Sequence, residues 1–404
     1  MLYFTKEKKD CTGCTACKAI CPVTCIDMVK DELGFPYPVA DLSLCIHCGL
    51  CEQVCPMRQD EPVQLEDRVP PMAYAAITND DVIWRASASG GAFSEISRNF
   101  ASGNEETVVY GAAFNELMVE HQGLPITWIQ AFHRSKYVQS DMKECFREIK
   151  AHLKGDRTVV FSGTPCQNAG LRMYVGREYS NLLCVDLVCH GVGSPDVFAA
   201  YLREKGTAAG KGVYSYEFRT KKRSWGNYPR YRSEIRYTDG ESEAQVEDPY
   251  TRLFLRQLCL RNCCGENCRF RSATRWSDLT IADFNHLSRV FPKVRDGRAY
   301  STIIASTRKG ADIVAALHQR MRVMPCELSD VVRYNPLFAR QAPGNPNRDA
   351  FFEAFVLGTP VLRLAEQYAQ KQRATITGWI VRHFPYGLKY LVNRLVVTLK
   401  RKRN

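Results

Sequence analysis

The stretch CTGCTACKAICP at residues 11–22, which returns as CIHCGLCEQVCP at residues 45–56, decides the fold of the N-terminal part of this chain. Both copies place four cysteines at CxxCxxCxxxC spacing and follow the last cysteine with a proline. This spacing lets three thiolates reach one cubane from a single tight loop, while the fourth ligand comes from the other copy. A zinc ribbon needs four ligands per site, so two identical runs of four cysteines that each end in proline are not typical of it.

The two copies therefore predict two 4Fe-4S clusters that exchange their fourth ligands. The predicted ligands are Cys11, Cys14, Cys17 and Cys55 for the first cluster and Cys45, Cys48, Cys51 and Cys21 for the second. Cys25 is left over, and His47 is expected beside the ligands or at the surface because the cysteines already fill both clusters. Residues 1–60 strongly resemble bacterial two-cluster ferredoxins, α+β modules that carry single electrons and contain no substrate chemistry.

The composition of the whole chain indicates a reducing compartment. The chain has 404 residues and 18 cysteines, nine of which lie between Cys11 and Cys55. Its first residues, MLYFTKEKKD, carry charge where a secretory signal would place apolar residues. Disulfides are disfavoured in such a compartment, so the cysteines indicate metal ligation or redox chemistry. No apolar stretch approaches the roughly 18 residues that a membrane span requires, and we expect a cytoplasmic protein.

After the module, the sequence predicts a linker and an α/β body. Residues 60–71, DEPVQLEDRVPP, are polar and end in two prolines, so the next domain is expected from Met72. Strand-like runs then alternate with helical patterns over about 90–102 and 140–154, which favours a mixed sheet with crossover helices in its first half and hairpins in its second. The expected strands are AYAAIT, TVVYGAAF, LPITWIQAF, TVVFSG, LLCVDLVC, YSYEFRT, RYRSEIRY, SDLTIADF and STIIAST.

Three segments of the body are unusual for a purely structural domain. SASGGAF, residues 87–93, puts two glycines at the expected start of a helix, where backbone amides could hold a phosphate; a plain helix-entry turn is the alternative. FSGTPCQ, residues 161–167, places Cys166 after an apolar strand, and VCHG, residues 188–191, places Cys189 after another. Because α/β sheets bind ligands at strand ends, these two cysteines predict a shared site.

Four more cysteines lie close together downstream, among arginines that would stabilise their ionised form. They are Cys259, Cys263, Cys264 and Cys268. Together with Cys166 and Cys189 they could supply the ligands of a third cluster, and the alternative is a set of buried apolar cysteines. His190 is the one candidate acid or base that we name, although a lone histidine is more often structural, so the catalytic residues stay unassigned.

SASGGAF, KYVQS, FSGTPCQNAGL, VCHGVGSP and RWSDLTIADF, in this order, resemble the beta subunit family of coenzyme F420 hydrogenases and dehydrogenases over about residues 72–340. The resemblance implies a flavin, usually FAD, lined by Ser89, Gly90 and Gly91. It also implies an adjacent 4Fe-4S cluster on Cys166, Cys189, Cys264 and Cys268. Members of the family resemble RPSCYxC where this chain has RNCCGENC at residues 261–268, so Cys263 competes with Cys264 as a cluster ligand. A second departure is Ala282, which stands where the family typically has Gly.

The charge of the chain is concentrated in its tail. Nine basic residues lie between Lys371 and Arg403 in a chain of net charge +12, with no Asp or Glu after Glu366. The apolar residues of 388–404 follow helical spacing, which predicts a basic amphipathic helix. Such a helix either lies on the inner face of an anionic membrane or docks on the protein or a partner subunit. Nucleic acid is not an expected partner, because aromatic residues are not interleaved with the final basic run.

We therefore expect an α+β ferredoxin module (1–60), an α/β body in two regions (72–175 and 176–340) and a helical tail (360–404). The predicted function is an iron-sulfur flavoprotein oxidoreductase, because a flavin can link one-electron clusters to two-electron chemistry on a small organic substrate. A protein that donates or accepts electrons is the expected partner. Some bacterial members of the family that this chain resembles are encoded together with surface-polysaccharide enzymes. From this resemblance we expect a link with surface-polysaccharide synthesis for this chain as well. The alternative is a non-catalytic electron-carrier subunit of a larger redox complex.

Overall fold

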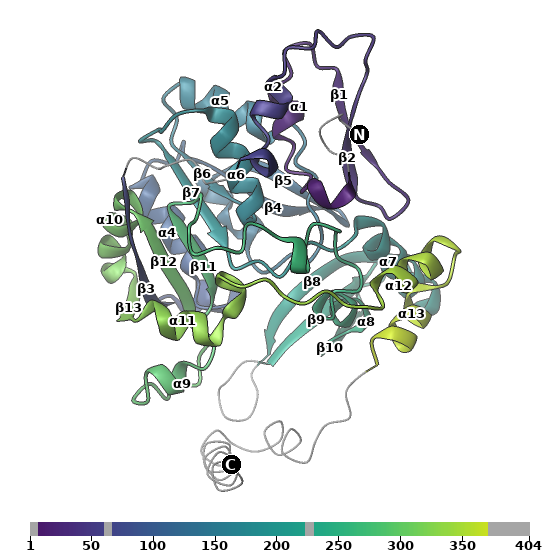
Figure 1. Ribbon diagram of the computed structural model, residues 1–404. Coiled ribbons are helices and arrows are strands. Elements are labelled where there is room, and N and C mark those ends of the chain that lie inside the picture. The colour runs from purple at the N-terminus through teal and green to yellow at the C-terminus, as the bar shows by residue number, and fades with distance from the viewer. Residues whose placement is uncertain (1–6, 60–66, 223–229, 371–404) are drawn as a thin grey trace, which may run out of the picture.

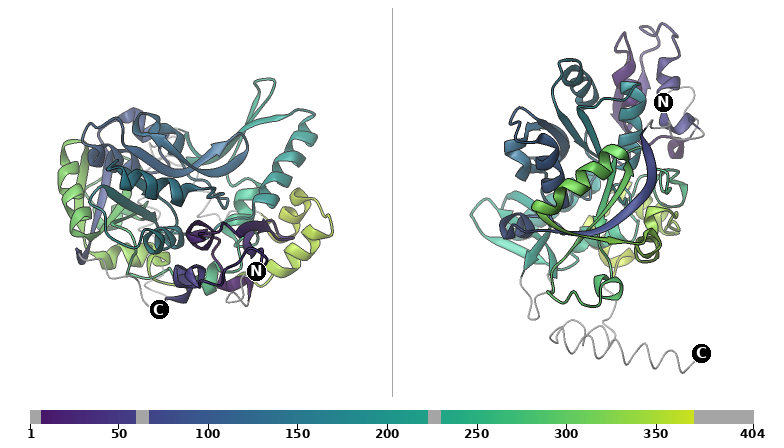
Figure 2. Two further views of the ribbon diagram at one scale, coloured as in Figure 1. Left: turned by 90° about the horizontal axis from the view of Figure 1, so that it is seen from above. Right: turned by 90° about the vertical axis from the view of Figure 1, so that its left-hand side faces the viewer.

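The structure is a computed structural model that describes residues 7–59, 67–222 and 230–370 (Figure 1). Residues 7–59 form a small module with strands β1 (Ile26–Lys30) and β2 (Pro36–Ala40), which pair antiparallel. Its helices are η1 (Lys8–Asp10), α1 (Ala16–Ile20), α2 (Leu50–Gln53) and η2 (Pro56–Arg58). The module lies at one side of the body, where α1 contacts α5 and α6 (Figures 1 and 2).

The two cysteine runs share a backbone conformation. Gly13 and Thr15 in the first run have φ values of 70° and 70°, and His47 and Gly49 at the equivalent places of the second run have 53° and 73°. These left-handed residues turn the chain back on itself between the first and third cysteines, so that neighbouring thiols face the same space. His47 is exposed, as expected, and its positive φ follows from its place in the repeat.

The body is built on an eight-stranded mixed sheet with the order β13-β3-β12-β11-β7-β6-β4-β5. The four neighbours β11, β7, β6 and β4 are parallel, so their carboxyl ends meet at one edge of the sheet. The strands are β3 (Arg68–Thr78), β4 (Val108–Asn115), β5 (Met118–Pro125), β6 (Val159–Ser162), β7 (Leu182–Leu187), β11 (Leu279–Asp283), β12 (Ser301–Thr307) and β13 (Met321–Cys326).

Helices cover both faces of this sheet, which is why its parallel strands are almost continuously apolar. On one face Val109 and Val160 pack with α4, α10 and the 3₁₀ helix η3, and on the other Tyr110 and Phe161 pack with α5 and α6. The helices of the body are α3 (Asp81–Ala86), α4 (Ala92–Ala101), η3 (Ile126–Phe132), α5 (Cys145–Lys154), α6 (Pro165–Val175), α9 (Leu287–Val290), α10 (Arg308–Ala316), η5 (Leu317–Gln319), α11 (Leu328–Tyr334) and η6 (Pro336–Phe338).

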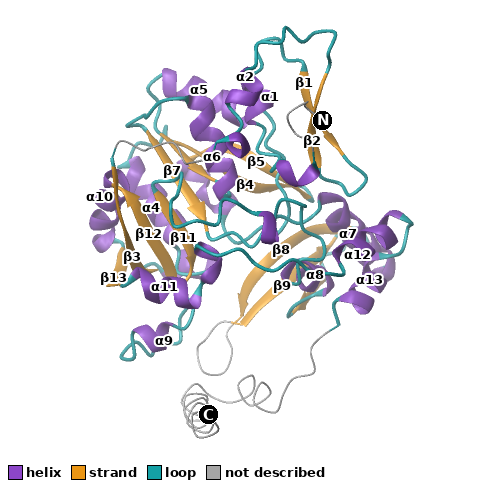
Figure 3. Cartoon of the chain, viewed as in Figure 1, coloured by secondary structure: helices purple, strands orange, loops and turns teal. Residues whose placement is uncertain are grey.

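A separate three-stranded sheet lies beside the main one (Figure 3). Its strands are β8 (Val213–Lys222), β9 (Arg230–Tyr237) and β10 (Ser242–Gln245), and it is packed by α7 (Pro195–Ala209), α8 (Pro249–Leu255), α12 (Arg348–Val356) and α13 (Val361–Tyr368). The 3₁₀ helix η4 (Gly265–Asn267) follows α8. Asp248 is buried in this core and accepts hydrogen bonds from the hydroxyls of Tyr201 and Tyr216 at 3.1 and 2.5 Å, which satisfies its charge.

The predicted α+β module followed by an α/β body with a mixed sheet is confirmed, with three differences. LPITWIQAF, expected as a strand, is largely the 3₁₀ helix η3. The expected β8–β9 hairpin belongs to the separate sheet rather than to the mixed one. Strands β5, β10 and β13 were not predicted from the sequence. The eight-stranded sheet also takes strands from both sides of the expected boundary between residues 175 and 176.

The expected linker ends earlier than residue 71, because β3 begins at Arg68. Pro70 and Pro71 are tolerated in this strand since they lie beyond the end of its pairing with β13 and beside an irregularity in its pairing with β12. Most of the predicted basic tail, residues 371–404, lies outside the described residues. Within the described ranges, none of the helices has the length and hydrophobicity that crossing a bilayer requires.

Candidate functional site

The first predicted ligand set lies around one small cavity. Cys11, Cys14, Cys17 and Cys55, which we call the inner cysteine group, line this cavity together with Met28 and Met57. Burial, and to a smaller extent the charges of Cys55 and Cys11, raise the pKa of Cys14 to about 12. Ligating thiols must lose their protons, so a site of this kind favours a cation-rich cluster that compensates the thiolates.

The second predicted set, Cys21, Cys45, Cys48 and Cys51, forms the outer cysteine group. Cys48 is exposed, whereas Cys21 is buried in an apolar cluster that Cys45 and Cys51 contact. The leftover Cys25 is in the same cluster, with its Sγ 3.5 Å from Cys21 Sγ. Around this group Leu42, Leu44 and Ile46 expose 72%, 56% and 60% of their surface, so the outer group faces away from the body.

Arginines of the body hold the module in place. Arg147 on α5 donates to the main-chain oxygens of Lys18 and Ala19 at 2.9 and 3.0 Å, and Arg269 donates to the main-chain oxygen of Met57 at 2.7 Å. Arg261 donates to the main-chain oxygen of Cys11 at 2.9 Å. Main-chain oxygens are fixed by the fold of the module, so these bonds set its orientation on the body.

The four body cysteines implied by the resemblance also come together. Cys166 is at the start of α6 after β6, and Cys189 follows the adjacent parallel strand β7. Cys264 and Cys268 flank η4. Burial raises the pKa of Cys189 to about 12, with smaller contributions from the charges of Cys264 and Cys268, and all three charges act on Cys166. We call Cys166, Cys189, Cys264 and Cys268 the body cysteine group.

Arg271 fixes the loops of this group. It donates to the main-chain oxygens of Cys189, His190 and Gly265 at 3.3, 2.7 and 2.8 Å. A hydrogen bond from Cys263, together with Arg261 and Arg271, lowers the pKa of Cys264 to about 7. Cys263 is therefore close to the same space, and the competition between Cys263 and Cys264 that the sequence raised stays open.

His190 lies beside the body cysteine group with its ring 5.2 Å from that of Phe254. Burial, and then the charge of Arg271, lower its pKa, so it is neutral at ordinary pH. Its Nε2 is buried without a hydrogen-bond partner in the described part of the chain. A neutral imidazole with one ring nitrogen left unpartnered in this way can exchange a proton there, which is the property that an acid or base needs.

Helix α6 connects the inner and body cysteine groups. A Cβ atom added to Gly170 of α6 would lie 2.9 Å from Cys14 Sγ, so the helix touches the inner group there. Cys166 lies four residues earlier in the same helix, which is about 6 Å along its axis. Met57, two residues after Cys55, shares an apolar cluster with Cys166 and Cys268. The two cysteine groups are therefore neighbours.

The segment expected to line a flavin has a clear structural role. Gly90 N–H donates to Ser301 Oγ at 2.9 Å and Ser89 Oγ donates to the main-chain oxygen of Tyr300 at 2.6 Å. Gly91 precedes α4 with a φ of 87°, as expected of a helix-entry turn. Ser89 also lines a cavity of about 340 Å³ together with Tyr231 and Asp283. Gly90 and Gly91 shape the loop, and Ser89 faces this cavity.

Four cations that interact with one another were not predicted from the sequence, and two of them, Arg219 and Lys221, contact the lining residues Asp283 and Ser89 of this cavity. The four are Arg134, Lys136, Arg219 and Lys221, which we call the basic group. Lys221 Nζ donates to the main-chain oxygens of Trp84 and Ser89 and lies 4.2 Å from the Trp84 ring centre. Arg219 pairs with Asp283 at 2.8 Å, and Arg134 pairs with Glu217. Lys136 lies in KYVQS and Lys221 is two residues from Arg219 on β8, which are the signals that could have identified them.

The two lysines of the basic group have pKa values far below the usual lysine value. Burial, and then the charge of Arg134, lower the pKa of Lys136 to about 7. Burial, and then Arg219, lower the pKa of Lys221 to about 7. An anionic group close to either ammonium group would raise its pKa again.

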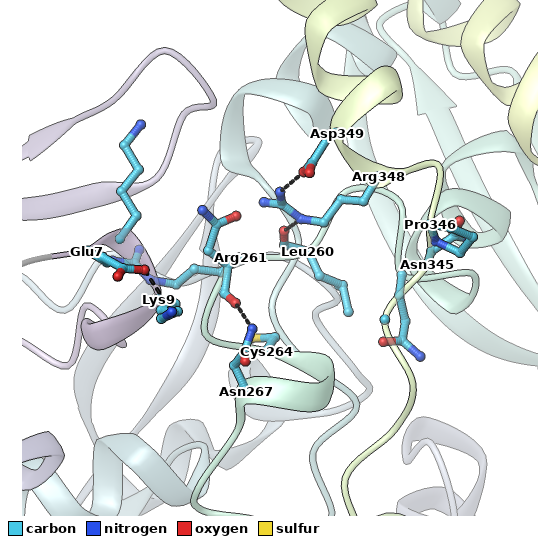
Figure 4. Close-up of a pocket in the computed structure, with 14 residues that line it drawn as sticks. Glu7, Lys9, Leu260, Arg261, Cys264, Asn267, Asn345, Pro346, Arg348 and Asp349 are labelled. Carbon is cyan, nitrogen blue, oxygen red and sulfur yellow. Dashed lines mark hydrogen bonds and ion pairs between the residues drawn. The ribbon is translucent and has the colours of Figure 1, made fainter.

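A second cavity, of about 550 Å³, lies where the module meets the body (Figure 4). Lys8 and Lys9 line it from the module, and Arg261, Cys264 and Arg348 line it from the body. Arg348 is held there by hydrogen bonds to the main-chain oxygen of Leu260 at 2.8 Å and to Asp349 at 3.1 Å. The cavity therefore gives solvent a route toward the side of Cys264.

Comparisons with known proteins match two regions of the chain to family models. Residues 10–58 match the model of the 4Fe-4S dicluster domain, and residues 156–330 match the model of the C-terminal part of the coenzyme F420 hydrogenase/dehydrogenase beta subunit. A solved chain of the xenon-derivatised F420-reducing [NiFe] hydrogenase complex from Methanosarcina barkeri is similar at 12% identity, over 73% of this chain and 94% of that chain, with a TM-score of 0.39. No curated protein matches the chain. Residues 156–330 therefore match the C-terminal part of the coenzyme F420 hydrogenase/dehydrogenase beta subunit family, and they follow a 4Fe-4S dicluster domain at residues 10–58.

Proposed function

We propose that this chain is an iron-sulfur flavoprotein oxidoreductase that moves electrons between a partner protein and a small organic substrate. The observation that carries the proposal is the order of the three cysteine groups. The outer group includes the exposed Cys48, the inner group touches α6 through Cys14, and the body group begins at Cys166 of the same helix. Clusters at these positions would form a path from the surface to the carboxyl edge of the sheet.

The thiols of the inner and outer groups fit two 4Fe-4S clusters with the ligand sets predicted from the sequence. The inner set shares one cavity, and the members of the outer set share one apolar cluster or its exposed margin. A third cluster on the body cysteine group is part of the proposal, with Cys263 as an alternative to Cys264. In this path the chain itself supplies fixed ligands and the arginines that hold the loops.

The basic group and the cavity beside Ser89 fit a phosphate-bearing flavin such as FAD. Within the described residues Lys136 forms no ion pair, and its Nζ donates only to the main-chain oxygens of Ala131 and His133, at 3.2 and 2.7 Å. A half-buried ammonium group without a carboxylate partner is costly unless an anion joins it. When bound, a flavin supplies exchange of single electrons with clusters and of two electrons with an organic substrate.

The partner protein is expected at the outer group. Leu42, Leu44 and Ile46 surround Cys45 there and give an apolar contact surface next to the outermost cluster position. An enzyme acting in surface-polysaccharide synthesis, as the resemblance suggested, would use the same electron path with its own organic substrate. Contact of the basic tail with a membrane surface stays part of the proposal and rests on the sequence alone.

The proposal is tested by the flavin and iron content of protein purified without oxygen. We expect about one flavin per chain and about eight to twelve irons, as two or three 4Fe-4S clusters require. Lys221→Met is expected to lose most of the flavin and keep its iron. Lys150→Met is the matched control, because Lys150 also donates to a main-chain oxygen and lies 4.5 Å from an aromatic ring, that of Tyr174. Iron without flavin in the wild type would favour the electron-carrier subunit instead.

A further inference from the structure

Arg261 connects the body directly to Cys11, a predicted ligand of the inner cysteine group. Its side chain is 1% exposed. Nε donates to the main-chain oxygen of Cys11 at 2.9 Å, Nη1 donates to Gln139 Oε1 at 3.0 Å, and Nη2 lies 3.7 Å from Cys11 Sγ. Its guanidinium also lies 4.0 Å from the ring centre of Tyr37, so it is held on every side.

The charge of this guanidinium is not neutralised by a carboxylate. Among the described residues Arg261 makes no ion pair, and its hydrogen-bond acceptors are main-chain oxygens, an amide oxygen and a sulfur. A buried charge is costly unless an opposite charge is near. The sulfur of Cys11 is the contacting atom that becomes negative when it ligates a cluster, so the cluster site supplies the missing charge.

The outer cysteine group has no equivalent arginine in the described part of the chain. Arg147 approaches it, with Nη2 3.4 Å from the main-chain oxygen of Cys21, but it contacts no ligand sulfur. Arg147 is also 31% exposed and pairs with Glu144 at 2.9 Å. Solvent and the carboxylate both weaken its field at the outer group. The two groups therefore differ in the electrostatic environment that the body gives them.

We propose that Arg261 is a positioning residue that raises the reduction potential of the inner cluster above that of the outer cluster. Reduction adds one negative charge to a cluster, and a buried cation beside a ligand sulfur stabilises that charge. One electron then leaves the reduced outer cluster, which becomes oxidised, and reduces the inner cluster, with no bond made or broken. This inference rests on the proposed function, because it concerns the clusters of the same path.

The experiment compares redox titrations of the two clusters, followed by electron paramagnetic resonance, in wild type and variants. Cys48→Ser assigns the signals, since it changes only the outer ligand set. In Arg261→Gln we expect the equilibrium constant for electron transfer from the outer to the inner cluster, which sets the distribution of one electron between them, to fall at least tenfold. A tenfold fall corresponds to a loss of about 59 mV in the difference between the two reduction potentials, as for any one-electron couple. Arg261→Lys keeps the charge and is expected to keep most of the distribution. Arg147→Gln is the matched control and should change it less than threefold.

Each outcome bears on the inference separately from the proposed function. An unchanged distribution in Arg261→Gln, with its iron retained, would overturn the inference while leaving the electron path intact. If Arg261→Gln loses iron, the test passes to Arg261→Lys. A wild-type distribution of the electron between the two clusters in Arg261→Lys would support a role of the charge. A tenfold shift of the electron away from the inner cluster in Arg261→Lys, with iron retained, would refute that role. Wild-type protein that contains no clusters would instead refute the proposed function.

Discussion

Replacing Gly170 with alanine tests whether α6 is the surface that holds the inner cysteine group against the body. Gly170 lies inside α6 and the new Cβ would lie 2.9 Å from Cys14 Sγ, 3.1 Å from Cys14 Cβ and 3.3 Å from Phe146 Cε2. Favourable contacts between carbon atoms lie at about 3.5–4.0 Å. The helix, the Cys14 loop or the Phe146 ring must therefore move by several tenths of an ångström.

Two opposing effects set the magnitude of this change. Alanine is about 1 kcal/mol more favourable than glycine inside a helix. Overpacking of a closely packed contact costs about 1–3 kcal/mol. The contact between α6 and the inner group is therefore expected to weaken by the overpacking cost of about 1–3 kcal/mol, which is a factor of about 5 to 150 in a rate or equilibrium constant. The gain in helix propensity stays within the body, so the loss is expected at the Cys14 loop.

The assay is the rate at which a chelator removes iron from anaerobic protein. In Gly170→Ala we expect about half of the ferredoxin-module iron to leave about 5- to 150-fold faster than in wild type, while the helical content of the body is unchanged. Gly155→Ala is the matched control, because a Cβ at the end of α5 meets only Ala151 and His152 oxygens at 3.6 Å. Equal iron release from the two variants would refute the contact between α6 and the inner group.

Three further predictions follow from single contacts. Cys25→Ser is expected to keep about eight irons in the module and Cys21→Ser to lose about half of them; iron loss in Cys25→Ser alone would show that the ligand sets are wrong. Burial lowers the pKa of Lys136 to about 7 from 10.5, so the unfolded chain binds the proton between these values and stability rises with pH there. Urea unfolding at pH 7 and 9 should show this rise, and Lys136→Met should remove about half of it, because Lys221 has a pKa lowered to about 7 as well and contributes the rest; an unchanged rise contradicts the assignment. Asp278→Ala breaks the buried pair with Arg172, whose atoms are 2.9 Å apart, and is expected to cost about 3–5 kcal/mol in urea unfolding; a loss below about 1 kcal/mol would contradict a structural role for the pair.

The ferredoxin module could be predicted because its fold depends on local spacing. The turns at Gly13 and His47 need only the residues between neighbouring cysteines, and the repeat makes the same turn twice. A histidine in a left-handed conformation would not have been expected from its residue type. Its place in the second copy explains it, because that copy must follow the backbone of the first.

The strand prediction for LPITWIQAF failed because the apolar residues satisfy two periods at once. Read in steps of two, Ile126 and Trp128 suggest one face of a strand. In the structure Ile126, Ile129 and Phe132 are buried, whereas Trp128 is 59% exposed. A spacing of three with an exposed residue between is the pattern of a 3₁₀ helix. Knowing which apolar residue is exposed would have decided between them, and the sequence alone does not contain that information.

The parts of the site that the sequence did not predict are contacts between distant segments. Arg261 meets the Cys11 main-chain oxygen across 250 positions, and Lys221 meets Ser89 across 132. Local periodicity contains no information on such pairs, because they form only when the two sheets and the module pack together. Cys166 and Cys189 were found because each follows an apolar strand, and adjacent parallel strands place their ends together.

The geometry of the proposed electron path depends on α6 more than on any loop. This helix begins with Thr164 and Gln167, which bond each other's backbone and side chain in a capping box. Toward its other end Arg172 is buried and donates to Asp278 at 2.9 Å. Between them it carries Cys166 and the Gly170 surface that receives Cys14. Because both ends are fixed to the core, the separation of the inner and body cysteine groups is set by helix geometry. A path built this way keeps its spacing when surface loops move, which electron transfer between neighbouring clusters requires.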